Sequence, residues 1–168
     1  ERTNPPPLDL MDGASGLASQ LVRDADSQLR ITADPGRPLD HRLEAYEDII
    51  DSEVGDTSLV RARNIERQMG LRQLYLKFEG GNPTGTQKDR IAFAQAMDAL
   101  RRGFETISVA TCGNYGAAVA LSASMAGLKC RVYIPENYHT KRIREMSDLD
   151  AEIVRVPGDY ENAVAFSS

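Results

Sequence analysis

Residues 106–135 read TISVATCGNYGAAVALSASMAGLKCRVYIP. Thr106 to Ala110 predicts a strand, and the alanine-rich run from Ala117 to Met125 predicts a helix. The alternating run from Lys129 to Ile134 predicts a second strand, which stops at Pro135. A strand, a helix of this length and a second strand are typical of a βαβ unit with a right-handed connection. The stretch therefore predicts an α/β protein built on an open parallel sheet with flanking helices.

The same alternation continues on both sides of this unit. Before it, residues 88–102 predict a helix with Ile91, Phe93, Ala94, Met97 and Leu100 as its apolar positions. After it, residues 140–149 predict a helix, residues 152–156 a strand, and residues 159–168 a last helix. Further upstream, residues 57–61 and 71–78 predict strands around a short helix at 64–69. In the run 71–78, apolar Leu74, Leu76 and Phe78 alternate with polar residues, which predicts a strand with one buried face.

The first 54 residues have a different pattern. Residues 16–29 and 41–51 predict two helices, separated by a Pro- and Gly-containing break, and Asp40 is a candidate cap for the second. We therefore expect an N-terminal extension at 1–54 and an α/β region at 55–168.

Composition excludes several classes of function. The chain has 168 residues, with 20 Lys and Arg against 25 Asp and Glu, and this net charge of −5 argues against a nucleic-acid partner. No stretch reaches the ~20 consecutive apolar residues of a membrane-spanning helix. Two cysteines cannot build a disulfide scaffold or the four ligands of a zinc site by themselves, and they favour a reducing, cytoplasmic setting. Two histidines argue against a His-rich metal site.

The loop from Glu79 to Arg90 reads EGGNPTGTQKDR and leads from a predicted strand into a predicted helix. Lys88 falls in the first turn of that helix, where the helix dipole opposes a cation and favours the neutral, nucleophilic amine. A plain alternative is a solvated lysine with Thr84 or Thr86 capping the helix. A phosphate-binding P-loop is excluded because its lysine would stand where this chain has Thr86.

The loop from Thr111 to Gly116 also leads from a strand into a helix. Gly113 and Gly116 leave the backbone open for a carboxylate or phosphate at the helix N-terminus, and Asn114 can donate a hydrogen bond. The alternative is a tight turn that needs glycine for its shape alone. The spacing lacks the G-x-G-x-x-G of a dinucleotide site. Cys112 would have some thiolate character at a helix start, but neither histidine forms a cysteine–histidine pattern with it.

Together these loops make the chain resemble the fold type II pyridoxal-phosphate enzymes, the tryptophan synthase β family, and threonine synthases most of all. Residues 82–90, NPTGTQKDR, are similar to the family motif N-P-T-G-S-x-K-D-R, and residues 111–116 are similar to [ST]-x-G-N-x-[GS]. Residues 55–59 resemble G-x-T-P-L, and residues 132–135 match a strand that ends in I-P. Three positions differ from the pattern: Gln87, Ser58 and Tyr115 stand where an apolar residue, proline and threonine are usual.

The resemblance implies roles for named residues. Lys88 would form a Schiff base with pyridoxal 5'-phosphate and then act as general base and acid. Asn114 would hydrogen-bond the phenolic oxygen of the cofactor. The substrate carboxylate would be bound within the run of Thr111, Cys112, Gly113, Asn114 and Tyr115: by Thr111, by Asn114 and by nearby backbone N–H groups, including those of Cys112 and Tyr115.

The resemblance also implies an activity and partners. It implies a lyase of the threonine synthase type, acting on an amino acid with a phosphate leaving group such as O-phosphohomoserine. Two alternatives stay open: β-replacement or β-elimination, as in cysteine synthases and dehydratases, and a non-catalytic half of a split enzyme. The family's glycine-rich phosphate loop does not follow Gly116 here. We therefore expect this chain to match the N-terminal half of a family member, with a C-terminal segment or second polypeptide completing the site in a homo-oligomer.

Overall fold

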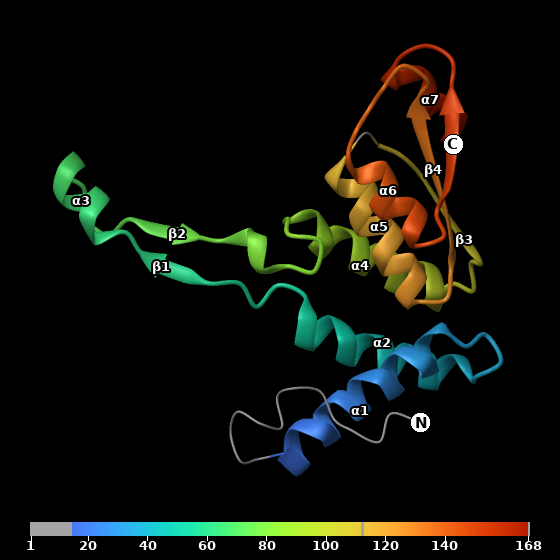
Figure 1. Ribbon diagram of the computed structural model, residues 1–168, viewed down its shortest axis with the longest axis horizontal. Coiled ribbons are helices and arrows are strands. Elements are labelled where there is room, and N and C mark those ends of the chain that lie inside the picture. The colour runs from blue at the N-terminus through green and yellow to red at the C-terminus, as the bar shows by residue number, and fades with distance from the viewer. Residues whose placement is uncertain (1–14, 112, 168) are drawn as a thin grey trace.

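The computed structural model describes residues 15–111 and 113–167, which form an α/β body and a projecting arm (Figure 1). In chain order the elements are α1 (Ser15–Ala33), α2 (Leu39–Glu53), β1 (Leu59–Arg61), α3 (Arg63–Met69), β2 (Tyr75–Lys77), the 3₁₀ turn η2 (Glu79–Gly81), α4 (Lys88–Arg101), β3 (Thr106–Ala110), α5 (Asn114–Met125), β4 (Lys129–Pro135), α6 (Arg142–Asp148), β5 (Glu152–Val156) and α7 (Tyr160–Ser167). The predicted order of strands and helices from residue 88 onward is confirmed.

The body is built on a parallel sheet with strand order β3-β4-β5. Val132 on β4 lies opposite Val109 on β3 and Ile153 on β5. Cys130, Val132 and Ile134 alternate along β4 and are buried in the core. This register places one face of the sheet against the helices, and the predicted fold class, an open parallel sheet with flanking helices, is confirmed.

The helix α5 lies at the centre of the core because its side chains are small and buried on most sides. Tyr46 on α2 stacks on Phe93 of α4, with ring centroids 6.0 Å apart, and its hydroxyl donates to the Ser122 carbonyl of α5 at 3.0 Å. Arg42, also buried, donates to the carbonyls of Thr32 at 2.9 Å and Ala126 at 2.8 Å. These contacts pack the two N-terminal helices on the body, while the division at residue 54 stays a prediction.

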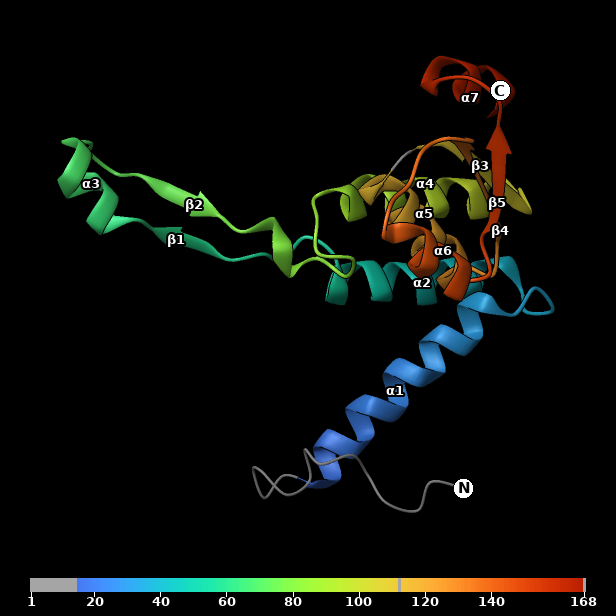
Figure 2. The same cartoon turned by 45° about the horizontal axis from the view of Figure 1, so that its top comes forward.

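The arm consists of β1, α3 and β2 and extends away from the body in both views (Figures 1 and 2). Its strands pair antiparallel, with Val60 opposite Leu76. At its tip the Arg61 guanidinium donates to the buried Glu66 carboxylate at 2.8 Å, and this ion pair lowers the pKa of Glu66. Large apolar side chains are exposed along the whole arm: Leu59, Val60, Ile65, Met69, Leu71, Tyr75, Leu76 and Phe78.

Several predicted details of these elements are wrong. The run 71–78 does not bury one face: only Tyr75–Lys77 pairs as a strand, and the described part of the chain covers neither face of it. The strand predicted at 57–61 is likewise shorter, Leu59–Arg61. On α4, Ile91 is exposed because the buried face follows Ala92, Phe93, Ala96 and Leu100 instead.

Helix starts also differ from the predictions. The helix expected from Ala117 begins at Asn114, because Gly113 is extended and the next residues already have helical geometry. Asp40 does not cap α2: the cap position is Pro38, and Asp40 lies in the first turn, where the helix dipole favours its charge. None of the helices within the described residues is long and apolar enough to cross a membrane.

Candidate active site

The loop between η2 and α4 is a tight turn that ends at Lys88. The Gly85 amide donates to the Asn82 carbonyl at 2.8 Å, so Asn82, Pro83, Thr84 and Gly85 form a hydrogen-bonded turn. Pro83 suits its second position, since proline fixes the φ that such a turn needs. Gly85 has a φ of +81°, a conformation that glycine adopts without steric cost. The motif NPTG therefore forms a turn that reverses the chain direction just before Lys88.

Asn82 anchors the beginning of this loop and is almost fully buried. Its Oδ1 accepts a hydrogen bond from the Gly55 amide at 3.0 Å. Its Nδ2 donates to the Glu79 carbonyl at 2.8 Å and to Glu79 Oε2 at 2.9 Å. One side chain thereby joins the loop to the chain after α2 and to η2.

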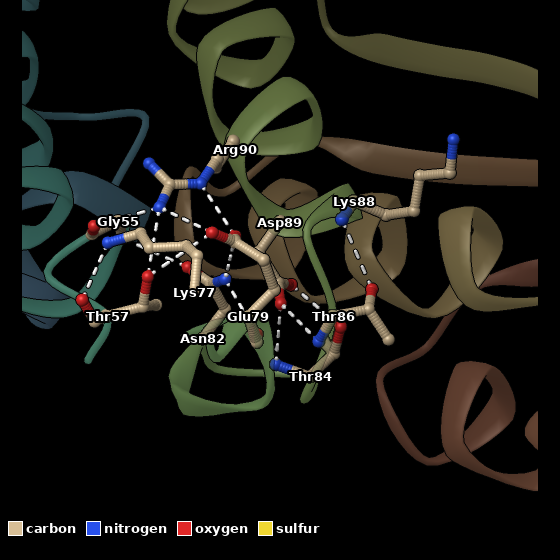
Figure 3. A network of polar contacts seen from close by, with 10 residues as sticks. All are labelled: Gly55, Thr57, Lys77, Glu79, Asn82, Thr84, Thr86, Lys88, Asp89 and Arg90. Atoms are coloured by element: carbon tan, nitrogen blue, oxygen red, sulfur yellow. Dashed lines mark hydrogen bonds and ion pairs between the residues drawn. The ribbon is translucent and has the colours of Figure 1, made fainter. Parts of the chain in front are cut away.

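Arg90 and Glu79 form an ion pair at the base of the arm (Figure 3). Arg90 Nε donates to Glu79 Oε2 at 2.8 Å, and its terminal nitrogen donates to Glu79 Oε1, the Gly55 carbonyl and Thr57 Oγ1 at 2.9 to 3.2 Å. The Arg90 guanidinium lowers the pKa of the Glu79 carboxyl to about 2. Lys77 Nζ donates to the Thr57 carbonyl at 2.6 Å. Both ends of the arm are thus fixed to the first turn of α4.

Asp89 fixes the other end of the loop. Its carboxylate is 0% exposed and accepts hydrogen bonds from the Thr84 amide at 3.0 Å, Thr84 Oγ1 at 2.7 Å and the Thr86 amide at 3.5 Å. Thr86 Oγ1 in turn accepts from the Lys88 amide at 3.2 Å. The two threonines therefore hold the backbone next to Lys88. The alternative in which Thr84 or Thr86 caps the helix is wrong, because the cap position of α4 is Gln87 and no side-chain cap forms there within the described residues.

The side chain of Lys88 stays outside this network. Figure 3 shows it pointing away from the Glu79–Arg90 pair, and the residue is exposed. Within residues 15–111 and 113–167, no hydrogen bond or ion pair engages Lys88 Nζ. This exposure is what the alternative of a solvated lysine expected, and it also leaves the amine accessible to an aldehyde.

The loop from Thr111 to Gly116 turns from β3 into α5. Thr111 is buried and its amide donates to the Tyr133 carbonyl at 3.1 Å, which extends the sheet by one residue. Gly113 is extended, with a φ of −177°, and Asn114 is exposed as the first residue of α5. Among residues 15–111 and 113–167 no side chain caps this helix, so its first-turn N–H groups can bind an anion. Cys112 lies outside the described residues.

Gly116 lets this loop pack closely against the body. A Cβ at this position would lie 2.7 Å from Met146 Sδ and 2.8 Å from Thr111 Cγ2. The glycine is therefore needed for close packing, whereas the alternative for this loop expected glycine for the shape of the turn. The N-terminus of α5 keeps its position because α6 can approach it at Gly116.

Tyr115 connects the start of α5 to the middle of α4. Its hydroxyl makes a short hydrogen bond to Gln95 Oε1 on α4, and burial raises the pKa of its phenol. Gln95 is seven residues, or about 10 Å of helix, beyond Lys88. The Tyr160 hydroxyl of α7 donates to the Ala110 carbonyl at 3.3 Å, next to this loop. The hydrogen-bond partners of Tyr115 and Tyr160 had no signal in the sequence, because they come from distant elements.

Other reactive groups are less suited to catalysis. Cys130 is a buried free thiol, and burial raises its pKa to about 11. In the part of the chain that the structure describes, no group of His, Cys, Asp and Glu is placed to hold a metal ion. Lys88 and the N-terminus of α5 remain the best-suited groups.

Comparison with known proteins shows the family of this chain. A family model described as "Pyridoxal-phosphate dependent enzyme" matches residues 50–168. A threonine synthase of Methanocaldococcus jannaschii is 33% identical over 111 residues, covering 66% of this chain and 27% of that protein. A cystathionine beta-synthase of Rattus norvegicus is 33% identical over 163 residues, covering 88% of this chain and 29% of that protein. This chain thus spans less than a third of the length of either relative.

A solved structure supports the fold. The crystal structure of O-acetyl serine sulfhydrylase isoform 3 from Entamoeba histolytica matches with a TM-score of 0.62 and 24% identity, covering 70% of this chain and 38% of that one. The family match includes both loops described above, the one that ends at Lys88 and the one that begins α5. The chain therefore belongs to the pyridoxal-phosphate-dependent enzymes of fold type II, and pyridoxal 5'-phosphate is its cofactor.

Proposed function

We propose that this chain supplies the cofactor-binding lysine of a lyase of the threonine synthase type. The observation that carries the proposal is the state of Lys88. Its backbone is held by Thr86, its neighbour Asp89 is buried and hydrogen-bonded, and its own amine is exposed and unengaged within the described residues. Such an amine can attack an aldehyde and can afterwards accept and return a proton.

The residues of the chain fit pyridoxal phosphate. When bound, the cofactor supplies an electron sink for the negative charge that develops at the substrate α-carbon. Lys88 provides the amine that links to the cofactor aldehyde. Asn114 provides an exposed side-chain amide that can donate to a phenolate oxygen.

The substrate would be held mainly by backbone. The uncapped first turn of α5 presents N–H groups and the positive end of a helix dipole, which together suit the carboxylate of an amino acid. Thr111, Gly113, Asn114 and Tyr115 border this helix end, and Cys112 belongs to the same proposed set. Lys88 would then move the proton between the α- and β-carbons of the bound amino acid.

Two substrate classes follow from the two relatives. The similarity to a threonine synthase supports an amino acid with a phosphate leaving group, such as O-phosphohomoserine. The similarity to a cystathionine beta-synthase extends over 88% of this chain, and it supports β-replacement or β-elimination as the second candidate. Turnover of O-phosphohomoserine against O-acetylserine and O-phosphoserine separates the two classes.

The exposed arm supports a partner that completes the site. A two-stranded ribbon is marginally stable alone, and this one exposes apolar side chains on both faces. We propose that the arm packs on polypeptide equivalent to the remainder of the longer relatives, as a C-terminal segment or a second chain, within a homo-oligomer. A cytoplasmic location is also part of the proposal and is supported by the free thiol of Cys130.

The lysine assignment is tested by titrating the protein with pyridoxal phosphate, reducing with borohydride and mapping the labelled peptides. We expect the label on Lys88, and Lys88→Ala should remove both the label and the absorbance band of the bound cofactor. Lys141→Ala is the matched control, since it also removes an exposed lysine. An unchanged band and label distribution in Lys88→Ala would contradict the assignment.

The partner proposal needs its own measurement. Leu76→Lys places a charge on an exposed apolar position of the arm, and it should weaken assembly in sedimentation experiments. Ile91→Lys, at an exposed apolar position on α4, is the control and should leave assembly unchanged. Equal assembly of both variants would show that the arm is not a contact surface between chains.

A further inference from the structure

Arg142 connects α6 to the loop that carries Lys88. The sequence places it in the basic run 141–144, which suggests a solvated helix face. The structure contradicts this for Arg142: its side chain is 25% exposed, whereas that of Arg144 is 89% exposed. Both terminal nitrogens of Arg142 donate to the Thr84 carbonyl, each at 3.2 Å, and one also donates to Glu145 at 2.7 Å.

Thr84 is held from two directions as a result. Asp89 on α4 accepts from its amide and its hydroxyl, while Arg142 on α6 donates to its carbonyl. These contacts fix the orientation of the peptide unit between Thr84 and Gly85. The contact with Arg142 joins positions 58 residues apart in the chain.

The contact between Arg142 and the Thr84 carbonyl matters because the next residue is Gly85. It has a φ of +81°, and glycine visits positive and negative φ about equally readily. Without a donor on the Thr84 carbonyl, the peptide unit before Gly85 keeps only the hydrogen bond of its own amide to the Asn82 carbonyl at 2.8 Å, and glycine opposes its rotation with small steric cost. Such a rotation changes the direction in which the chain enters α4, and Lys88 is the first residue of that helix.

We propose that Arg142 is a positioning residue for Lys88, which acts by fixing the Thr84–Gly85 peptide; this proposal rests on the proposed function of Lys88. A guanidinium suits this role because two of its nitrogens donate to the Thr84 carbonyl while the side chain stays paired with Glu145. Lysine at this position can donate one such hydrogen bond, whereas methionine fills similar space and donates none.

The test compares Arg142→Met, Arg142→Lys and Glu145→Gln with the native chain. Glu145→Gln is the matched control, because it removes the ion pair of Arg142 within α6 and leaves the Thr84 carbonyl contact in place. The first readout is hydrogen exchange of the Thr84 and Gly85 amides without cofactor. Loss of a charge-assisted hydrogen bond predicts roughly tenfold faster exchange in Arg142→Met. We expect partial recovery in Arg142→Lys and native exchange in Glu145→Gln.

The second readout is the rate at which pyridoxal phosphate and borohydride label Lys88, relative to Lys77, Lys129 and Lys141 in the same sample. Arg142→Met should slow the labelling of Lys88 alone, and Arg142→Lys should restore part of the rate. If all four lysines change together, or if exchange and labelling stay native in Arg142→Met, the positioning role is wrong.

The two readouts separate this inference from the proposed function. If Lys88 is unlabelled in the native chain, the proposed function of Lys88 fails. The exchange of the Thr84 and Gly85 amides then still decides whether Arg142 fixes the loop.

Discussion

Arg90 Nε lies 2.8 Å from Glu79 Oε2, and this ion pair joins the first turn of α4 to the turn that ends the arm. The same guanidinium donates to the Gly55 carbonyl at the entrance to the arm. Glycine is required at position 55, since its φ is +95° and a Cβ would lie 2.7 Å from Arg90 Nη1. One arginine, two residues beyond Lys88, therefore fixes both ends of the arm next to the candidate nucleophile.

Acid should weaken the Glu79–Arg90 pair. The folded-state pKa of Glu79 is depressed from 4.5 to about 2, so the stabilisation is complete above about pH 4.5 and is lost as the pH falls towards 2. We expect the thermal midpoint of the native chain to fall across this range. Glu79→Gln lacks the titrating group, so its midpoint should fall less steeply. Parallel midpoint curves for the two proteins would contradict this.

Asp89→Asn should destabilise the lysine loop. The buried carboxylate accepts from two groups of Thr84 and from the Thr86 amide, and an amide offers only one oxygen in its place. A loss of about 1–3 kcal/mol of unfolding free energy is expected from chemical denaturation. Asp98→Asn on the same helix is the control, since its ion pair with Arg102 is exposed and should be worth less than about 1 kcal/mol.

Gly116→Ala should disturb the start of α5. The added methyl group would lie under 3 Å from both Met146 and Thr111, and overpacking of this kind costs about 1–3 kcal/mol. Gly113→Ala is the comparison, because no atom lies within 4 Å of its Cβ position and its φ of −177° suits any residue. Thermal unfolding should show a lower midpoint for Gly116→Ala alone. A larger loss in Gly113→Ala would mean that the tight packing at Gly116 is not the constraint.

Phe93→Ala should remove a central contact of the core. Phe93 is 0% exposed and stacks on Tyr46, so truncation is expected to cost about 3–5 kcal/mol. Ile91→Ala on the same helix starts from a side chain that is 50% exposed and should cost less than about 1.5 kcal/mol. Denaturant midpoints measure both. Similar losses for the two variants would show that the buried face of α4 is assigned wrongly.

Much of the body could be predicted from local pattern. The runs that became β3, β4 and β5 have the apolar residues and the flanking Gly and Pro that strands need, and α4 and α5 have helical spacing between them. The prediction failed where the burial of a side chain depends on segments that are distant in the sequence. The alternation at 71–78 implied a buried face, yet Leu76 and Phe78 are exposed because nothing in the described chain covers the arm.

The two candidate loops could be recognised from the sequence because the residues that form each loop are close together in the chain. Asn82, Pro83, Gly85 and Lys88 follow one another within a single turn, and backbone hydrogen bonding over a few residues forms that turn. The hydrogen bonds that hold this turn from distant parts of the chain could not be predicted from the sequence. Charge on a helix is solvated by default, so the basic run 141–144 indicates a solvated face, and only a contact across 58 residues shows otherwise for Arg142.

The sequence alone determined the strand and helix order of the body, the placement of Lys88 in the first turn of a helix and that of Asn114 in a loop leading into a helix, because propensity, glycine positions and hydrophobic spacing act over a few residues. The tertiary structure alone decided that Arg90 fixes the arm, that Arg142 binds Thr84, and that the Lys88 amine is outside the polar network. Those outcomes depend on which side chains meet when distant segments pack, and hydrogen bonds act only over about 3 Å.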